Sequence, residues 1–289
     1  MLFVLAQQLL NGLLLGSMYA LLAISYTLVL GVLDMLNLAQ GEILTAGALT
    51  ACSVLRGTGS LPLALGAAVL TGAVLSLLVE YFCFRLPRGD TQVVTTIAMG
   101  MVLQNVYTEI WGSEPLKFPR LEWDFRLSLG PLSLNGGQIV LLALTAAMML
   151  LLSAVIDRSR FGRQIRAMAS STKAARVAGV DIRAATVKTF ALSGLIAGVA
   201  GVMAGIEFTS ITPFIGGAVG EKAMAAMVIG GAGSALGAGA AGLILGVAEI
   251  LCVGYLGAQY REIIIFPLLI LFLCLRPSGL FRKGRVDRA

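Results

Sequence analysis

Residues 157–188 read DRSRFGRQIRAMASSTKAARVAGVDIRAATVK and form a basic island between long apolar segments. Only Asp157 and Asp181 oppose its eight basic residues, which are Arg158, Arg160, Arg163, Arg166, Lys173, Arg176, Arg183 and Lys188. In a membrane protein, a short loop rich in lysine and arginine lies on the cytoplasmic side of the bilayer. This island therefore indicates how the apolar segments on either side of it are oriented.

A short helix is predicted at the centre of the island. Ser170, Ser171 or Thr172 can cap its start, and Gly179 can supply the left-handed residue that ends it. Its small apolar face consists of Ala174, Ala175, Val177 and Ala178. A helix this short is not stable alone in water, so something must pack against it. We therefore expect a cytosolic partner to bind the protein through this loop.

The composition indicates an all-α integral membrane protein. Of the 289 residues, 58% are hydrophobic and 12% are charged, and the mean hydropathy is +0.92. Soluble domains contain about 25% charged residues. The net charge of +6 gathers in residues 157–188 and 276–288, so it reports orientation in the membrane rather than affinity for nucleic acid.

No catalytic residue, metal site or bound cofactor is predicted. Histidine is absent, which removes histidine general bases, the Ser-His-Asp arrangement and the commonest transition-metal ligand. The cysteines lie in apolar runs without paired spacing, so we expect small buried hydrophobic residues rather than metal ligands or disulfides. They are Cys52, Cys83, Cys252 and Cys274.

A helix needs about 20 apolar residues to cross a bilayer core, and many segments of the chain qualify. The first is a span rather than a signal peptide, because no basic region precedes it. The candidate spans are residues 9–30, 38–55, 61–84, 93–111, 139–156, 189–211 and 263–275, with 223–252 as a special case, which gives about eight or nine transmembrane helices. The neutral, proline-rich loop 112–135 is expected on the outer face with the amino terminus, and residues 85–90 on the inner face.

The glycine-rich segment 223–252 is predicted to be discontinuous. The basic tail 276–288 belongs inside, so this segment must cross the membrane twice or return to the side that it left. We place broken helices within 230–239, deep in the protein, because irregular backbone at membrane depth survives only where protein or water satisfies it.

The glycines of this segment are expected to serve helix packing rather than phosphate binding. The motif G-x-x-x-x-G-K-[ST] does not occur in the chain, and small residues at helical spacing let helices approach closely in lipid. The packing candidates are Gly230, Gly231, Gly233 and Gly237. If the protein uses ATP, another chain must hydrolyse it.

Polar side chains inside the apolar spans are candidates for a solute path, because a charged group costs roughly 2.5–3.5 kcal/mol at the bilayer centre. They form three groups: Asn37, Gln40 and Glu42; Gln104, Asn105 and Glu109; and Glu207 with Glu249. We expect Asn37, Gln40, Glu42, Gln104 and Asn105 to face one water-accessible cavity. For Glu109, a position near the headgroups is the alternative. For all of them, hydrogen bonding between helices that fixes packing is the competing interpretation.

Four motifs resemble those of the inner-membrane permeases of branched-chain amino acid ABC importers. The patterns N-G-x-x-x-G-x-x-Y-A-L-x-A and G-x-x-x-x-x-N-x-A-H-G-[ED] are matched by Asn11, Gly12, Gly16, Tyr19, Ala20, Leu21, Ala23, Gly31, Asn37, Ala39, Gly41 and Glu42. The loop pattern G-R-x-x-R-A-x-x-x-x-x-x-A-A-x-x-x-G is matched by Gly162, Arg163, Arg166, Ala167, Ala174, Ala175 and Gly179. The pattern A-V-I-G-G-x-G-S resembles residues 227–234, and R-P-x-G-L is matched by Arg276, Pro277, Gly279 and Leu280.

One position departs from the family pattern, since Gln40 stands where a histidine is usual. An essential ionisable role is therefore not expected there, although an amide can still form hydrogen bonds.

The resemblance implies a single transmembrane permease domain over residues 1–289 in the bacterial inner membrane. It also implies two ABC ATPase subunits that bind the ATP, a second homologous permease and an extracytoplasmic solute-binding protein. Residues 157–188 become the ATPase-coupling loop, whose short helix would fit a groove of an ATPase subunit. The loop residues that carry this expectation are Gly162, Arg163, Arg166, Ala174, Ala175 and Gly179.

The predicted function is ATP-driven import of branched-chain amino acids, and three alternatives stay open. Similar permeases serve urea, short amides or other amino acids. A self-sufficient channel or ion-coupled carrier would need no ATPase; the intramembrane acids allow it, and the capped basic loop argues against it. A membrane enzyme is disfavoured, because the sequence contains no nucleophile–base pair or metal motif.

Overall fold

The computed structural model describes residues 2–87, 91–119, 126–129, 132–231 and 233–260, together with Pro267, Cys274 and Gly279. Its helices are α1 (Leu2–Leu33), α2 (Gln40–Thr58), α3 (Leu61–Val79) with a π-helical extension η1 (Glu80–Arg85), α4 (Gln92–Trp111), α5 (Gly136–Arg158), α6 (Arg160–Ser170), α7 (Thr172–Val177), α8 (Ile182–Phe208), α9 (Ile215–Gly230), α10 (Ala235–Leu256) and a 3-10 turn η2 (Ala258–Tyr260). Its strands are β1 (Leu116–Lys117), β2 (Arg126–Leu129), β3 (Leu132–Asn135) and β4 (Ser210–Ile211). The predicted all-α membrane architecture is confirmed.

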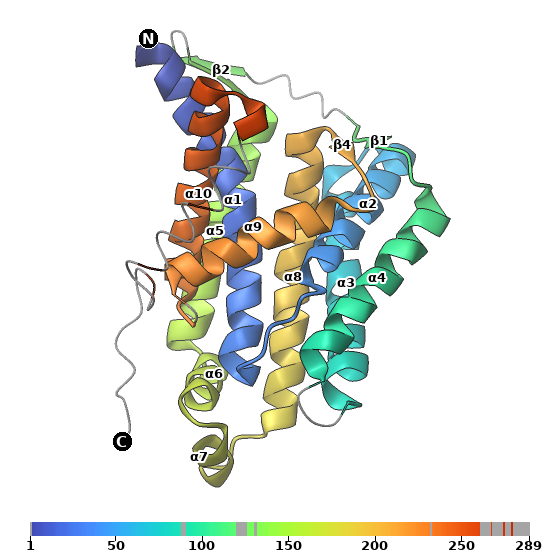
Figure 1. Ribbon diagram of the computed structural model, residues 1–289, viewed down its shortest axis with the longest axis vertical. Coiled ribbons are helices and arrows are strands. Elements are labelled where there is room, and N and C mark those ends of the chain that lie inside the picture. Colours follow the sequence, from blue (N-terminus) through green and yellow to red (C-terminus); the bar gives the residue numbers. More distant parts are fainter. Residues whose placement is uncertain are drawn as a thin grey trace.

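The strands and the basic island lie at opposite ends of the helix bundle. Strand β1 pairs antiparallel with β4, so that Leu116 faces Ile211, and β2 pairs with β3 in a hairpin. Figure 1 shows both pairs at the end where α1 begins, whereas α6 and α7 form the other end. The described strands β1–β4 and the basic island are therefore separated by the length of the spans.

Five helices are long and apolar enough to cross a membrane, counted over the residues that the structure describes: α1, α3 with η1, α5, α8 and α10. The larger number expected from the sequence also included α2 and α4, which are polar at several positions, and the segment that contains α9, which has 16 residues. The span predicted at 263–275 and the basic tail lie outside the described residues, apart from Pro267, Cys274 and Gly279.

The predicted span 38–55 begins with an irregular segment rather than a helix. After α1 ends, residues 34–39 run without helical structure toward the middle of the bundle, where α2 starts (Figure 1). Backbone amides here are satisfied by side chains: that of Ala39 donates to Asn37 Oδ1 (3.2 Å) and that of Leu38 to Thr96 Oγ1 (3.2 Å). Such bonds let non-helical backbone persist where lipid and bulk water are excluded.

The glycine-rich segment is discontinuous, as predicted, and its break lies at 231–234. Gly231 adopts a φ of +103°, and the Ser234 hydroxyl caps α10 by accepting from the Gly237 amide (3.1 Å). In Figure 1, α9 enters from the end that holds β4 and lies obliquely across the bundle, and α10 returns to the same end. The segment therefore returns to the side that it left, which is one of the two predicted alternatives.

The core is built around α1, whose central turns are fully buried among α10, α8, α5 and α9. Backbones meet directly at glycines. A Cβ on Gly246 of α10 would collide with Gly16 of α1, and one on Gly194 of α8 with Gly72 of α3. A third such contact joins α2 and α8 at Gly47 and Gly198. Close approach of this kind gives helices in a membrane their packing energy.

Candidate functional site

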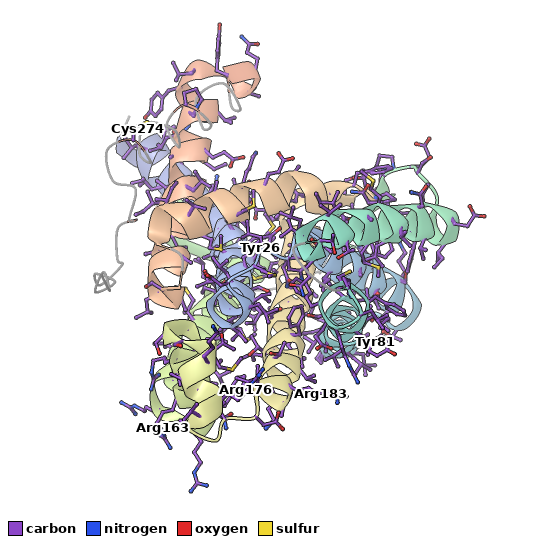
Figure 2. The ribbon with its side chains drawn as sticks, turned by 60° about the horizontal axis from the view of Figure 1, so that its bottom comes forward. Tyr26, Tyr81, Arg163, Arg176, Arg183 and Cys274 are labelled. Carbon is purple, nitrogen blue, oxygen red and sulfur yellow. The ribbon has the colours of Figure 1, made fainter. Side chains whose placement is uncertain are left out.

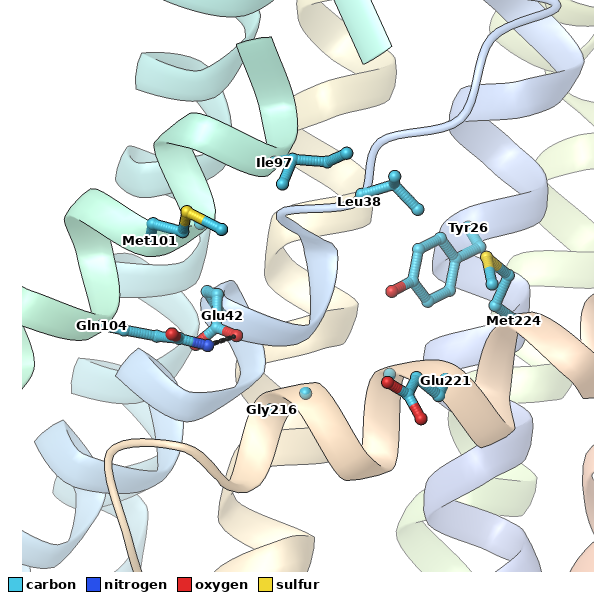
Figure 3. A pocket seen from close by; sticks show the side chains of 12 residues that line it. Tyr26, Leu38, Glu42, Ile97, Met101, Gln104, Gly216, Glu221 and Met224 are labelled. Atoms are coloured by element: carbon cyan, nitrogen blue, oxygen red, sulfur yellow. Dashed lines mark hydrogen bonds between the residues drawn. The ribbon is translucent and has the colours of Figure 1, made fainter. Parts of the chain in front are cut away.

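A cavity of about 390 Å³ opens between α1, α2, α4 and α9 (Figure 3). Its size falls within the roughly 300–1,000 Å³ range of small-molecule sites. The residues that line it are Tyr26, Leu38, Glu42, Ile97, Gly100, Met101, Gln104, Gly216, Gly217, Gly220, Glu221 and Met224. Two of the polar residues predicted for the solute path, Glu42 and Gln104, are among them.

Glu42 lies in the first turn of α2 and is 5% exposed. Its Oε1 accepts a hydrogen bond from Gln104 Nε2 (2.8 Å), and the Tyr107 hydroxyl donates to its backbone carbonyl (3.0 Å). Within the described part of the chain, Oε2 is buried and accepts no hydrogen bond. The Thr45 hydroxyl lies close to this carboxyl group, and its hydrogen bond goes to the carbonyl of Gly41 (3.3 Å).

Tyr26 and Glu221 complete the polar part of the cavity wall. Figure 3 shows the Tyr26 ring reaching from α1 with its hydroxyl toward the cavity, and Glu221 on α9 below it. The sequence interpretation missed both. A tyrosine inside an apolar span is not distinguished from a core residue, and Glu221 lies just before the 223–252 segment, although an acid next to Lys222 in an apolar run was a visible signal.

Asn37 and Gln40 are adjacent to the cavity but do not line it. Asn37 Nδ2 donates to Gln40 Oε1 (2.9 Å), and Gln40 Nε2 donates to Ser25 Oγ (2.5 Å). Ser25 in turn donates to the carbonyl of Ser193 on α8 (2.8 Å). All four side chains are buried, so this network holds the start of α2 against α1 and α8.

Asn105, Glu207 and Glu249 are not brought to the cavity. Asn105 is exposed on another side of α4 and donates to the carbonyl of Met101 (2.8 Å). Glu207 is half-buried near the end of α8. Glu249 is fully buried and forms an ion pair with Lys222 of α9 (3.0 Å). Of the five residues expected to face one cavity, the structure brings Glu42 and Gln104 to its wall and does not bring Asn37, Gln40 or Asn105 there.

The glycines at the break divide into two kinds. Gly230 and Gly237 pack against each other, since a Cβ on Gly230 would collide with the Gly237 backbone. Gly231 and Gly233 have positive φ angles and make the turn between the helices. A Cβ on Gly233 would meet open space, so close packing does not explain that glycine.

Helix α6 follows α5 after a single residue and lies close to its last turn. A Cβ on Gly162 would collide with the carbonyl of Ile156, and the Arg166 guanidinium donates to that same carbonyl. Ser159 caps α6 by accepting from the Gly162 amide (2.9 Å). A larger residue at position 162 would therefore collide with α5. Arg166 provides a hydrogen-bond donor for a carbonyl at the end of α5 that lacks a partner within the helix. Arg163 is exposed.

Helix α7 has caps at both ends, as the sequence predicts. Ser171 accepts from the Ala174 amide (3.2 Å). Gly179 has a φ of +80° and donates to Arg176, while the Val180 amide donates to the Ala175 carbonyl (3.0 Å), which together form a Schellman motif.

The predicted apolar face of α7 needs one correction, because Ala175 is not on it. Ala175 is 2% exposed and belongs to a buried cluster with Val32 of α1, Met168 of α6 and Ala185 of α8. Ala174, Val177 and Ala178 are exposed, and Val177 is 92% exposed. These burial differences follow from how α7 is rotated about its axis. The side that holds Ala175 faces the protein, and the opposite side faces outward.

All eight basic side chains of the island are exposed. Figure 2 shows Arg163, Arg176 and Arg183 at the end of the molecule formed by α6 and α7. An exposed apolar side chain within this cationic surface gives a potential partner both a hydrophobic anchor and an electrostatic match.

Comparison with known proteins places these features in context. Residues 8–273 match the model of the family described as branched-chain amino acid transport system, permease component. The chain is 35% identical to the high-affinity branched-chain amino acid transport system permease protein LivH of Escherichia coli K12, and 35% identical to BraD of Pseudomonas aeruginosa. Each alignment covers 98% of this chain and 97% of the relative. The probable branched-chain amino acid transport permease protein of Methanocaldococcus jannaschii is 28% identical, over 92% of this chain and 89% of its own.

Proposed function

This chain belongs to the permease family of branched-chain amino acid transport systems, and we propose that it pairs with a second homologous permease to conduct the solute through the bacterial inner membrane. Two ABC ATPase subunits would drive the cycle, and an extracytoplasmic binding protein would deliver the solute. The observation that carries the proposal is α7: a short capped helix with Val177 exposed on a cationic surface.

Helix α7 suits a coupling role because its two sides differ. The Ala175 side is packed in a buried cluster with residues of α1, α6 and α8, so a force applied to α7 would reach the spans α1 and α8. The opposite side carries the exposed apolar side chain of Val177 among basic residues. A hydrophobic groove on an ATPase subunit would remove that side chain from water.

Branched-chain amino acids are the proposed solutes. The relatives named above carry that description, and the cavity offers an apolar wall of Leu38, Ile97, Met101 and Met224. Urea or a short amide would not use that wall. A self-sufficient channel or carrier would have no use for α7.

The cavity is proposed to bind its solute weakly. A conduit that held the solute tightly would release it slowly, and a separate binding protein can supply the affinity.

The test is uptake of labelled leucine into proteoliposomes that contain the permease pair, both ATPase subunits and the binding protein. Uptake is expected to require ATP inside the vesicle, to be competed by isoleucine and valine, and to be unaffected by urea. Equal uptake without the ATPase subunits would overturn the ABC assignment. Competition by urea without competition by isoleucine and valine would overturn the solute assignment.

A further inference from the structure

The cavity contains a buried carboxylate oxygen whose hydrogen-bonding capacity is not used. Glu42 is 5% exposed and lines the cavity, and its Oε2 accepts no hydrogen bond from the described residues. Burying a carboxylate oxygen without a partner costs free energy, more so away from bulk water. A group from outside the chain that donates hydrogen bonds and carries positive charge would remove that cost.

The charge of the cavity points to the same kind of group. Glu42 and Glu221 contribute two carboxylates, Tyr26 contributes a hydroxyl, and none of the described residues that line the cavity is a lysine or an arginine. Figure 3 shows Glu42 and Glu221 coming from different helices, α2 and α9. A cavity with two acids and no base attracts a cation.

The remaining wall limits what that cation can be. Leu38, Ile97, Met101 and Met224 form an apolar surface in the same cavity, so a ligand with a charged head and a short apolar tail is accommodated better than a hydrated metal ion. A primary ammonium group offers three N–H donors, enough for the two acids and the phenol oxygen. The first turn of α9 contributes Gly216 and Gly217 to the same wall, and the amino end of a helix favours negative charge.

We propose that this cavity recognises the primary ammonium group of the solute, with Glu42 as the main contact and Glu221 and Tyr26 completing the site. The inference rests on the proposed function and adds a selection step within the membrane. Amino acids gain an ion pair with Glu42 in addition to the hydrogen bond. Urea and short amides can donate a hydrogen bond but carry no positive charge, and carboxylates without an ammonium group gain neither.

The test measures how ligands protect a cysteine in the cavity. The assembled permease–ATPase complex, without binding protein, carries Met101→Cys on α4 with the native cysteines replaced by alanine. The labelling rate by N-ethylmaleimide is recorded against leucine, 3-methylbutylamine, 4-methylpentanoate and urea. Leucine and the amine are expected to slow labelling, and 4-methylpentanoate and urea to leave the rate unchanged.

Two further variants assign the effect to the carboxylates. Glu42→Gln is expected to raise the leucine concentration for half-protection by about tenfold or more, as befits loss of a charged hydrogen bond. Glu221→Gln changes an exposed position and should raise the leucine concentration for half-protection by a smaller factor. This variant provides the test if the Glu42→Gln complex does not assemble. Glu109→Gln is the matched control, since Glu109 is an exposed acid of α4 that does not line the cavity.

Several results would overturn the inference. They are equal protection by 4-methylpentanoate and leucine, no protection by leucine, an unchanged concentration dependence in both glutamine variants, and protection by sodium ions alone at the same concentrations. Each of these results is compatible with ATP-driven leucine uptake by the unmodified complex, so the proposed function would still stand. Absence of that uptake would instead count against the proposed function.

Discussion

The ammonium nitrogen of Lys222 lies 3.0 Å from Oε1 of Glu249, and both side chains are buried between α9 and α10. The two helices are consecutive and separated only by the break at 231–234. The pair therefore ties together two helices that the backbone alone would leave free to swing. Charge in the protein interior is tolerated here because each ion neutralises the other.

Removing one partner of this pair should destabilise the protein more than removing both. Lys222→Met or Glu249→Leu alone leaves an uncompensated buried charge, with an expected cost of about 3–5 kcal/mol. The double variant Lys222→Met/Glu249→Leu should recover most of that loss. The thermal unfolding midpoint of the purified protein in detergent measures it. Single variants that unfold with the wild-type midpoint would contradict the prediction.

Exposed Val177 and buried Ala175 should respond differently to the same change. Val177→Arg is expected to leave the unfolding midpoint unchanged and to lower solute-stimulated ATP hydrolysis by about tenfold or more, because burying an unpaired charge in the interface costs several kcal/mol. Ala175→Arg should instead lower the midpoint, since it forces a charge into the contact with Val32 and Met168. Leu86→Arg is the control, an exposed apolar residue outside the basic island. Full stimulation in Val177→Arg would remove α7 from the interface.

Residues at the two ends of the bundle should be reachable from opposite sides of the membrane. In a background without the native cysteines, Lys173→Cys should react with an impermeant thiol reagent only from the cytoplasmic side, and Ser113→Cys only from outside. Both positions are exposed. Ser278→Cys, in the tail outside the described residues, is expected to behave like Lys173→Cys. Labelling of Ser278→Cys from outside would contradict the orientation inferred from the basic tail.

Adjacent residues of α4 provide a matched pair for the solute path. Gln104 lines the cavity and donates to Glu42, whereas Asn105 is exposed and bonds within its own helix. Gln104→Leu should therefore reduce ATP-driven leucine uptake severalfold, because it leaves the Glu42 carboxylate without its donor. Asn105→Leu should leave uptake unchanged. Equal effects of the two substitutions would mean that the cavity is not on the solute path.

The contact between α1 and α10 should not accept a larger side chain. Gly246→Leu is expected to lower the unfolding midpoint strongly or to abolish folding, because its Cβ already meets the backbone of Gly16. Gly66→Leu is the matched control on α3, where an added Cβ would meet open space. A midpoint for Gly246→Leu as high as that of Gly66→Leu would contradict the close packing seen here.

The spans and the break could be predicted because both are properties of local composition. Long apolar runs specify helices in lipid, and the glycines at 230–233 mark where one ends. The irregular segment 34–39 could not be predicted in this way. Its backbone is satisfied by Asn37 and by Thr96, which is distant in the sequence, so its stability depends on tertiary neighbours.

Only part of the candidate site could be predicted, because the sequence shows which residues are polar but not which way a helix is rotated. Glu42 and Gln104 stand out as polar residues in apolar helices, and both line the cavity. Asn105 stands out equally, but a helix that is apolar on most sides carries little information on its rotation. Tyr26 gives no polar signal within α1, and the ion pair of Glu249 depends on Lys222, 27 residues earlier.

Two kinds of contact hold the helices together: backbone contacts at glycines and hydrogen bonds between side chains. Helices α1 and α10, α2 and α8, and α3 and α8 touch backbone to backbone, so none of these pairs can separate without opening a void. Helix α4 is held by side-chain bonds, from Gln104 and Tyr107 to Glu42 and from Trp111 to Ser53 (2.7 Å). Since α4 forms one side of the cavity, an outward tilt of this helix would widen the cavity without separating the helix pairs that meet at glycines.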